Sequence, residues 1–288
     1  METLPDETHV GGVVLSVADL DRVTSFYADV VGLAVQHRTG DRAVLGAGSD
    51  ELLELRAAPE APARPPDAAG LYHLAVRFPT RAALAAALGR VREDWQLTGA
   101  SDHGVSEALY LDDAEDNGVE LYRDRPRERW ERRPDGEVHF ETRRLDLEDL
   151  AAAADSSADV PSAGDGGSAG APPGTDVGHV HLEVTDLNRA RAFYVDALGF
   201  DVTARVRGAL FVSAGDYHHH LGLNTWQGRS SPASGRGLDR VEIALPDEGA
   251  VSAAAERLRS AGYSAERTAD GVTAADPDGI EIRLVVDG

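Results

Sequence analysis

The residues of this chain best suited to chemistry are its ten histidines, at positions 9, 37, 73, 103, 139, 179, 181, 218, 219 and 220. The chain has no cysteine, so disulfides and thiolate metal sites are excluded. Any metal must therefore be held by His, Asp or Glu. An imidazole with an ordinary pKa of ~6.5 also suits proton transfer near neutrality. These residue types indicate metal binding, acid–base catalysis or both.

Two of the histidines are present in only one copy of an internal repeat. Residues 15–35 read LSVADLDRVTSFYADVVGLAV, and residues 182–202, at an offset of 167, read LEVTDLNRARAFYVDALGFDV, with ten of 21 positions identical. At this offset His179 corresponds to Gly12, and His73 corresponds to Arg240. Each half thus has one histidine that the other half lacks, and the two histidines are at different positions of the repeat. This pattern suggests a single site built from both halves.

The repeat also predicts the elements that must position these side chains. In each copy a short alternating strand leads to Asp19 or Asp186 as a helix N-cap, then to a helix that ends at Gly32 or Gly199. Three short strands follow each helix, and the same order recurs more weakly from His73 and from Val241. The expected helices are 20–30, 81–94, 187–197 and 249–261, and the expected third-module strands after the helix are 201–206, 208–213 and 218–225. The sequence therefore predicts an α+β fold of four β-α-β-β-β modules.

The modules fall into two predicted domains, at 8–126 and 177–288, joined by a linker at 127–176. The linker begins with Arg-rich text and a short helical pattern at 147–154. It ends in SSADVPSAGDGGSAGAPPGTD, which is rich in Ser, Gly and Pro and has no apolar period. We expect this last stretch to be mobile and the linker to be partly disordered.

The charge of the chain limits its partners. The net charge is −22, and all 28 basic residues are arginine. Such a charge disfavours nucleic acid and anionic membranes. No apolar run approaches the ~20 residues of a membrane span, and the N-terminus lacks a signal-peptide pattern. We expect a cytoplasmic protein with an acidic, halophilic type of surface.

This charge predicts that salt stabilises the protein. Repulsion between like charges reaches far at low ionic strength, where the Debye length is ~30 Å at 0.01 M, but is screened within ~3 Å at 1 M. We expect the melting temperature to rise from dilute buffer to molar KCl. A melting temperature independent of KCl concentration would contradict the halophilic interpretation.

Five segments give the chain a family resemblance. They are GLYHLAV (70–76), DHGVSEALYL (102–111), DNGVELYRDRP (116–126), VGHVHLEVTDL (177–187) and YHHHLGLNTW (217–226). In this order, and with helices of the DLxxxxxFYxxxLG type, the chain resembles the vicinal oxygen chelate superfamily, which includes glyoxalase I, extradiol dioxygenases and bleomycin-resistance proteins. The closer resemblance is to the two-domain catechol-2,3-dioxygenase group. It implies paired modules that form two cupped mixed sheets, with a divalent metal inside.

The resemblance also implies a ligand set. The superfamily takes one ligand from the first strand of each of two partner modules and a carboxylate from a last strand. Only His73, Glu120 and His179 complete such a set, because the opposite set would be Gly12, Arg240 and Glu281. Two imidazoles and one carboxylate form the facial triad of non-haem Fe(II) oxygenases. His181 shares the strand face of His179 and is a second-shell group or an alternative ligand.

Further catalytic residues follow from the same resemblance. Strand alternation sends His218 and His220 to one face and His219 to the other. Extradiol enzymes use a histidine of this strand as acid and base, for which we take His220 first and His218 second. Tyr110 and His103 stand where these enzymes have a Tyr and a His near the substrate hydroxyls.

We therefore expect an extradiol dioxygenase that uses O2 to open a small aromatic diol, in aromatic degradation. Fe(II) is the expected cofactor, with Mn(II), Zn(II) and Ni(II) as alternatives, and a homo-oligomer is left open. Two other functions are a glyoxalase I-like metal-dependent lyase and a metal-free small-molecule-binding protein. The first usually needs a fourth protein ligand, commonly glutamate, and residues 217–226 contain no acidic residue.

Overall fold

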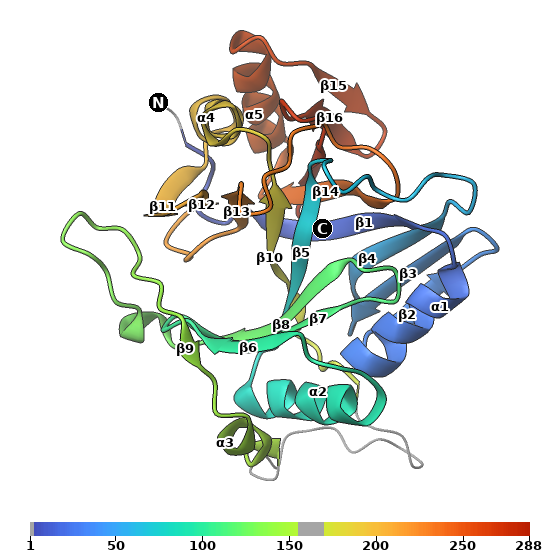
Figure 1. Cartoon of the computed structure of the whole chain (residues 1–288). Helices are drawn as coiled ribbons and strands as arrows, with labels where there is room; N and C mark the ends of the chain where they lie inside the picture. Colours follow the sequence, from blue (N-terminus) through green and yellow to red (C-terminus); the bar gives the residue numbers. More distant parts are fainter. Residues whose placement is uncertain (1–2, 155–169) are drawn as a thin grey trace.

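Two large sheets form the molecule, and each combines one module from either half of the chain (Figure 1). The structure is a computed structural model that describes residues 3–154 and 170–288. The first sheet holds, in spatial order, β15 (Ala265–Thr268), β16 (Gly271–Ala275), β17 (Glu281–Val286), β14 (Gly237–Leu245), β1 (His9–Val17), β4 (Asp50–Ala57), β3 (Arg42–Ala47) and β2 (Ala34–Arg38). It therefore joins the first module to the fourth.

The second sheet joins the third module to the second. Its order is β11 (Asp201–Val206), β12 (Ala209–Ser213), β13 (Leu221–Asn224), β10 (Asp176–Glu183), β5 (Gly70–Arg77), β8 (Gly118–Asp124), β7 (Ser106–Asp112), β6 (Gly99–Asp102) and β9 (Arg143–Arg144). In each sheet a parallel pair lies on either side of the central antiparallel pair, and the outer pairs are antiparallel. The predicted α+β fold of four modules in two mixed sheets is confirmed.

The central pair of the second sheet brings the two halves together. Strands β5 and β10 are antiparallel and run side by side (Figure 1). Their register makes His73 and His181 Cα partners, and His179 faces Ala75. Histidines more than a hundred residues apart in sequence therefore lie on neighbouring strands.

The repeated helices are shorter than predicted and continue in a wider form. The helices of the described residues are α1 (Leu20–Ser25), η1 (Phe26–Val31), α2 (Arg81–Asp94), η2 (Arg127–Arg129), α3 (Leu147–Ala151), α4 (Leu187–Arg191), η4 (Ala192–Leu198) and α5 (Glu248–Ser260). Both η1 and η4 are π-helical, and both end at the predicted glycine, Gly32 or Gly199, with φ of 92° and 104°. A left-handed backbone is the reason that glycine serves there.

Helix contacts join the two modules within each half. The guanidinium of Arg90 on α2 donates to Val31 O at 2.6 Å, and Arg257 on α5, at the repeat offset of 167, donates to Leu198 O at 2.9 Å. Sheets thus connect the halves, while helices connect the modules inside a half. The ranges 8–126 and 177–288 stay a prediction as domain bounds.

A buried tyrosine–aspartate contact repeats in both halves. Tyr27 donates to Asp113 at 3.3 Å, and Tyr194 donates to Asp276 at 3.1 Å. Asp276 also accepts from the backbone N–H groups of Asp278 and Ile280, both at 2.9 Å. Burial raises the pKa of Asp276 to about 6, although these backbone hydrogen bonds act in the opposite direction.

The raised pKa predicts a pH-dependent contribution to stability. The folded protein holds the Asp276 proton more tightly than the unfolded chain, so this stability is present below pH ~4 and is lost as pH rises to about 6. We expect Asp276→Asn to remove that loss, so that the variant unfolds at a higher urea concentration than wild type at pH 8. At ~1.4 kcal/mol per pKa unit, its free energy of unfolding should be higher by up to roughly 3 kcal/mol. Asp216→Asn, whose side chain is 92% exposed, is the control. A variant equally weakened at pH 5 and pH 8 would contradict the assignment.

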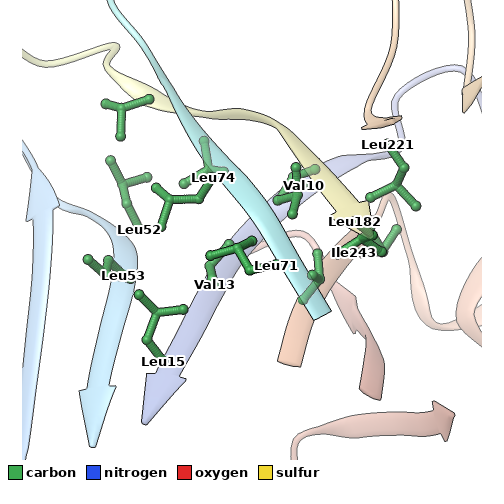
Figure 2. Close-up of a cluster of buried hydrophobic side chains, with 14 of the residues drawn as sticks. Val10, Val13, Leu15, Leu52, Leu53, Leu71, Leu74, Leu182, Leu221 and Ile243 are labelled. Carbon is green, nitrogen blue, oxygen red and sulfur yellow. The ribbon is translucent and has the colours of Figure 1, made fainter. Parts of the chain in front are cut away.

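The main core lies between the two sheets. Figure 2 shows Leu15 of β1, Leu74 of β5, Leu182 of β10 and Ile243 of β14 in one cluster of buried side chains. All four are fully buried. The central strands of the two sheets are therefore fixed against each other by apolar packing, and the second sheet gains a rigid base for its polar face.

The segment after the second module is packed against the second sheet. Trp130, Val138, Leu145 and Leu150 are buried within it, and β9 pairs with β6. These residues fall in the predicted linker, whose Ser/Gly/Pro-rich part lies mostly outside the described residues, at 155–169. Across residues 3–154 and 170–288, no helix is long and apolar enough to cross a membrane.

Candidate metal centre

A cavity of about 680 Å³ opens on the polar face of the second sheet. Strands β5, β8 and β10 supply its base with His73, Glu120 and His179, and these three side chains are buried. His73 comes from the first half and His179 from the second. The predicted ligand residues are therefore brought together at one end of one cavity.

The three predicted ligands converge on one point. The Glu120 carboxylate oxygen Oε2 lies 3.0 Å from His73 Nε2 and 3.2 Å from His179 Nε2. Two donors bound at right angles to one first-row metal, at about 2.1 Å each, lie about 3 Å apart. The buried His73 Nε2 atom has no hydrogen-bond partner of acceptable geometry among the described residues. The donors fit a divalent metal.

The charge states of these groups also suit metal binding. Burial alone would raise the pKa of Glu120, but the neighbouring imidazoles of His179 and His73 hold it well below its ordinary value. Burial lowers the pKa of His179 to about 4, although Glu120 acts in the opposite direction. An ionised carboxylate and a neutral imidazole are the forms that bind metals.

Tyr110 and His103, the other two predicted catalytic residues, lie on the wall of the same cavity. His103 Nδ1 lies 2.7 Å from the Glu141 carbonyl oxygen, which can only accept, so Nδ1 carries the proton. In the neutral ring, Nε2 then accepts from the Tyr110 hydroxyl at 2.7 Å. Burial and the nearby Glu120 carboxylate raise the pKa of Tyr110 well above its ordinary value. The phenol is neutral, and its oxygen keeps lone pairs for a ligand in the cavity.

The structure does not bring His218 and His220 to this cavity, where His219 lies instead. His220 Nδ1 instead lies 2.9 Å from Ser213 Oγ at the end of β12. The cause is a bend. Gly222 on β13 faces the His181 ring, which lines the cavity. If the strand continued with regular alternation, residue 220 would also face the cavity. However, β13 begins only at Leu221. Residues 217–220 do not have strand geometry, so the residue that faces the cavity is His219 instead of His220.

Comparison with known proteins identifies the family of the chain. The model of the Glyoxalase/Bleomycin resistance protein/Dioxygenase superfamily matches residues 9–121 and 176–284. The chain belongs to this superfamily. It is 40% identical over 294 residues to the catechol-2,3-dioxygenase of Bacillus subtilis (strain 168), over 99% of this chain and 100% of that one.

Solved structures share the superfamily fold at low identity. Glyoxalase I from Zea mays has a TM-score of 0.58 at 17% identity, over 97% of this chain and 92% of that one. A further protein of Bacillus subtilis has a TM-score of 0.67 at 13% identity, over 99% and 86%. The two sheets built from paired modules are thus the common fold of the superfamily.

His181 is a further imidazole beside the three predicted ligands. Donor atoms of His73, His179 and His181 lie within 4.8 Å of one another. The His181 ring stacks on that of His73, with centroids 4.3 Å apart, and its Nε2 lies 2.9 Å from His219 Nε2. In this arrangement the Nε2 atom of His181 is engaged by His219 rather than directed at Glu120.

Aromatic side chains complete the cavity, and among them the sequence indicates only Trp226 as a pocket residue. They are Tyr72, Phe140, Phe211 and Trp226. Phe140 packs on Phe211 with centroids 4.8 Å apart, and Tyr72 meets Trp226 edge to face at 5.5 Å. Phe140 comes from the predicted linker, where the alternating apolar residues of Val138 and Phe140 were a usable signal. These rings give the cavity flat apolar walls.

Proposed function

We propose that this protein is an extradiol ring-cleaving dioxygenase that uses Fe(II) and O2 on a small aromatic diol. The observation that carries the proposal is the convergence of His73, Glu120 and His179 at the base of an aromatic-walled cavity. The 40% identity to a protein named catechol-2,3-dioxygenase supports it. A bound Fe(II) would supply open coordination positions for the diol and O2 and electron transfer between them.

The protein's own residues would bind and orient the diol. Phe140 and Trp226 lie in the cavity walls and offer apolar surface to a flat ring. The Tyr110 oxygen, whose proton is directed to His103, can accept a hydrogen bond from a substrate hydroxyl. Because His103 is itself fixed on the Glu141 carbonyl, the phenol is held in one orientation.

His219 is the residue we propose for proton transfer. Its ring lies 4.2 Å from that of His179, between centroids, and it borders the cavity. Burial lowers the pKa of His219 well below its ordinary value, so the imidazole is neutral and can accept a proton. This role passes to His219 from His220 and His218, which lie outside the cavity lining.

A glyoxalase I-like reaction is the second candidate, and His181 is the observation in its favour. A fourth protein ligand is what that chemistry usually needs, and His181 is near enough to His73 and His179 to share a metal with them. Under the dioxygenase proposal, His181→Ala keeps its metal. Loss of the metal from this variant would favour the four-ligand site.

Anaerobic purification followed by metal analysis and an ¹⁸O2 assay tests the dioxygenase proposal. We expect about one iron per chain, O2 uptake with catechol, and both labelled oxygen atoms in a ring-opened semialdehyde product. Oxidation of catechol to a quinone without ring opening, or no O2 uptake by the iron-loaded protein, would contradict it.

A further inference from the structure

His219 belongs to a hydrogen-bonded chain of side chains that begins at the half-buried Asp124. Asp124 Oδ1 lies 2.8 Å from His218 Nε2. The Nδ1 atoms of His218 and His219 lie 2.7 Å apart, and His219 Nε2 lies 2.9 Å from His181 Nε2. Both histidines of this pair are buried, at 0% and 5% exposure. The chain therefore runs from His219 in the cavity lining to Asp124, the last residue of β8.

The carboxylate at the far end sets the direction of every hydrogen bond. One oxygen of Asp124 accepts from the Arg77 guanidinium and the other lies 2.8 Å from His218 Nε2, and a carboxylate paired with an arginine only accepts. His218 must then carry a proton on Nε2. The Ser-His-Asp triad is the precedent for a carboxylate-bound histidine that rests with a single proton, and in that form His218 Nδ1 is a lone pair that accepts from His219 Nδ1–H. The Nε2 atom of His219 is left without a proton and faces the cavity side.

Surrounding contacts hold the first two members of the chain in place. Arg77 donates to the other carboxylate oxygen of Asp124 at 3.0 Å and is itself held by Asp176 at 2.9 Å. Thr203 donates to the His218 carbonyl oxygen at 2.6 Å, and the Trp130 ring lies 5.1 Å from the His218 ring. Neither Asp124 nor His218 lines the cavity, so both can act on a substrate only through His219.

We infer that Asp124 and His218 are positioning residues that hold His219 in one tautomer, with the lone pair of its Nε2 atom presented to the cavity. The inference rests on the proposed function, in which His219 accepts a substrate proton. Before substrate enters, His181 Nε2–H uses this lone pair. A substrate hydroxyl that reaches the same position replaces His181 as the donor.

The tautomers themselves give the first test, which needs no turnover. Full-length protein with ¹⁵N-labelled histidine and diamagnetic Zn²⁺ is studied by long-range ¹H–¹⁵N NMR, with signals assigned by single substitutions. We expect His219 as the Nδ1–H form and His218 as the Nε2–H form. A neutral His219 protonated at Nε2, or His218 as an imidazolium, would overturn the inference.

Asp124→Asn should reverse the chain. The charged Arg77 needs an acceptor, so the amide oxygen turns to Arg77 and the amide N–H₂ faces His218 Nε2. His218 then carries its proton on Nδ1, and His219 shifts to the Nε2–H form. A wrong tautomer of this kind in the serine protease triad lowers kcat by about 10⁴-fold. We expect kcat to fall by ~10²–10⁴-fold, the usual contribution of acid–base catalysis, with KM and iron content unchanged.

Asp176→Asn is the matched control. It removes the other carboxylate partner of Arg77 but leaves the contact between Asp124 and His218 intact. We expect kcat and the His219 tautomer to stay at the wild-type values. Equal effects of Asp124→Asn and Asp176→Asn would overturn the inference, because the arginine network rather than the imidazole chain would then be responsible.

A double-mutant cycle separates positioning from general stability. In a His218→Phe background, Asp124→Asn should have no further effect on kcat, since its only route to His219 is gone. Additive losses would overturn the inference. Failure of the wild type to cleave catechol would instead count against the proposed function, and the wild-type NMR spectrum would still decide the tautomers, even if Asp124→Asn did not fold.

Discussion

Replacement of His73, Glu120 or His179 by alanine is expected to abolish iron binding and ring cleavage while the fold persists. All three donors meet at Glu120 Oε2, so each substitution removes one of three protein ligands. Changes to outer-shell partners alone cost about 10–100-fold in metal affinity, so loss of a ligand should exceed ~100-fold. Metal analysis and circular dichroism of each variant check this expectation.

Glu281→Ala is the control for the carboxylate. Glu281 has the corresponding place in the fourth module, but its Cα partner is Arg240, and Arg240 Nε lies 2.9 Å from Glu242. A metal that binds only the folded protein at 100 times its Kd stabilises it by about 2.7 kcal/mol. Wild type and Glu281→Ala should gain this stability with added metal, and the three ligand variants should not. Metal retained by Glu120→Ala but lost from Glu281→Ala would show that the module pairing is misassigned.

The modules could be predicted because the chain repeats itself. Local signals such as Asp19 before a helix and Gly32 after it are readable from residue types, and both act as expected. The π-helical turns could not be read in this way. They are held by tertiary contacts, such as Arg90 on the Val31 carbonyl, which a sequence window does not contain.

The pairing of modules from different halves could be predicted only from the residues expected to bind a metal. Nothing in the strand patterns links β5 to β10, yet the survival of His73 and His179 at non-equivalent repeat positions required their modules to meet. Hydrophobic periodicity reports burial, not the identity of the partner strand. A shared ligand set carries that information.

The histidine run marks the limit of the same reasoning. Alternation cannot say which of the three histidines meets the cavity, because residues 217–220 precede β13. That depends on where β13 begins, and a bend of one residue reverses the result. Strand ends are set by the register with neighbouring strands, here Val180 with Leu221, and are not visible in YHHHLGLNTW.

His219→Phe is therefore expected to lower kcat strongly while the enzyme keeps its iron and binds catechol. The substitution retains a ring of similar size but removes the proton acceptor from the cavity, and acid–base catalysis contributes ~10²–10⁴-fold. His218 Nδ1 and His181 Nε2 each lose a partner, so a lower melting temperature should accompany the slower turnover. Stopped-flow single turnovers and iron analysis measure both effects.

His220→Phe is the matched comparison, one residue along the same bend. His220 is equally buried but bonds to Ser213 Oγ and the Ala214 N–H and does not line the cavity. Its loss removes those hydrogen bonds and should lower stability, with kcat close to that of wild type. If His220→Phe is the slow variant and His219→Phe turns over normally, then the proton acceptor is His220. If His219→Phe instead loses its iron, then His219 is a metal ligand. A metal centre with four protein ligands, as in the glyoxalase I-like alternative, would then be favoured.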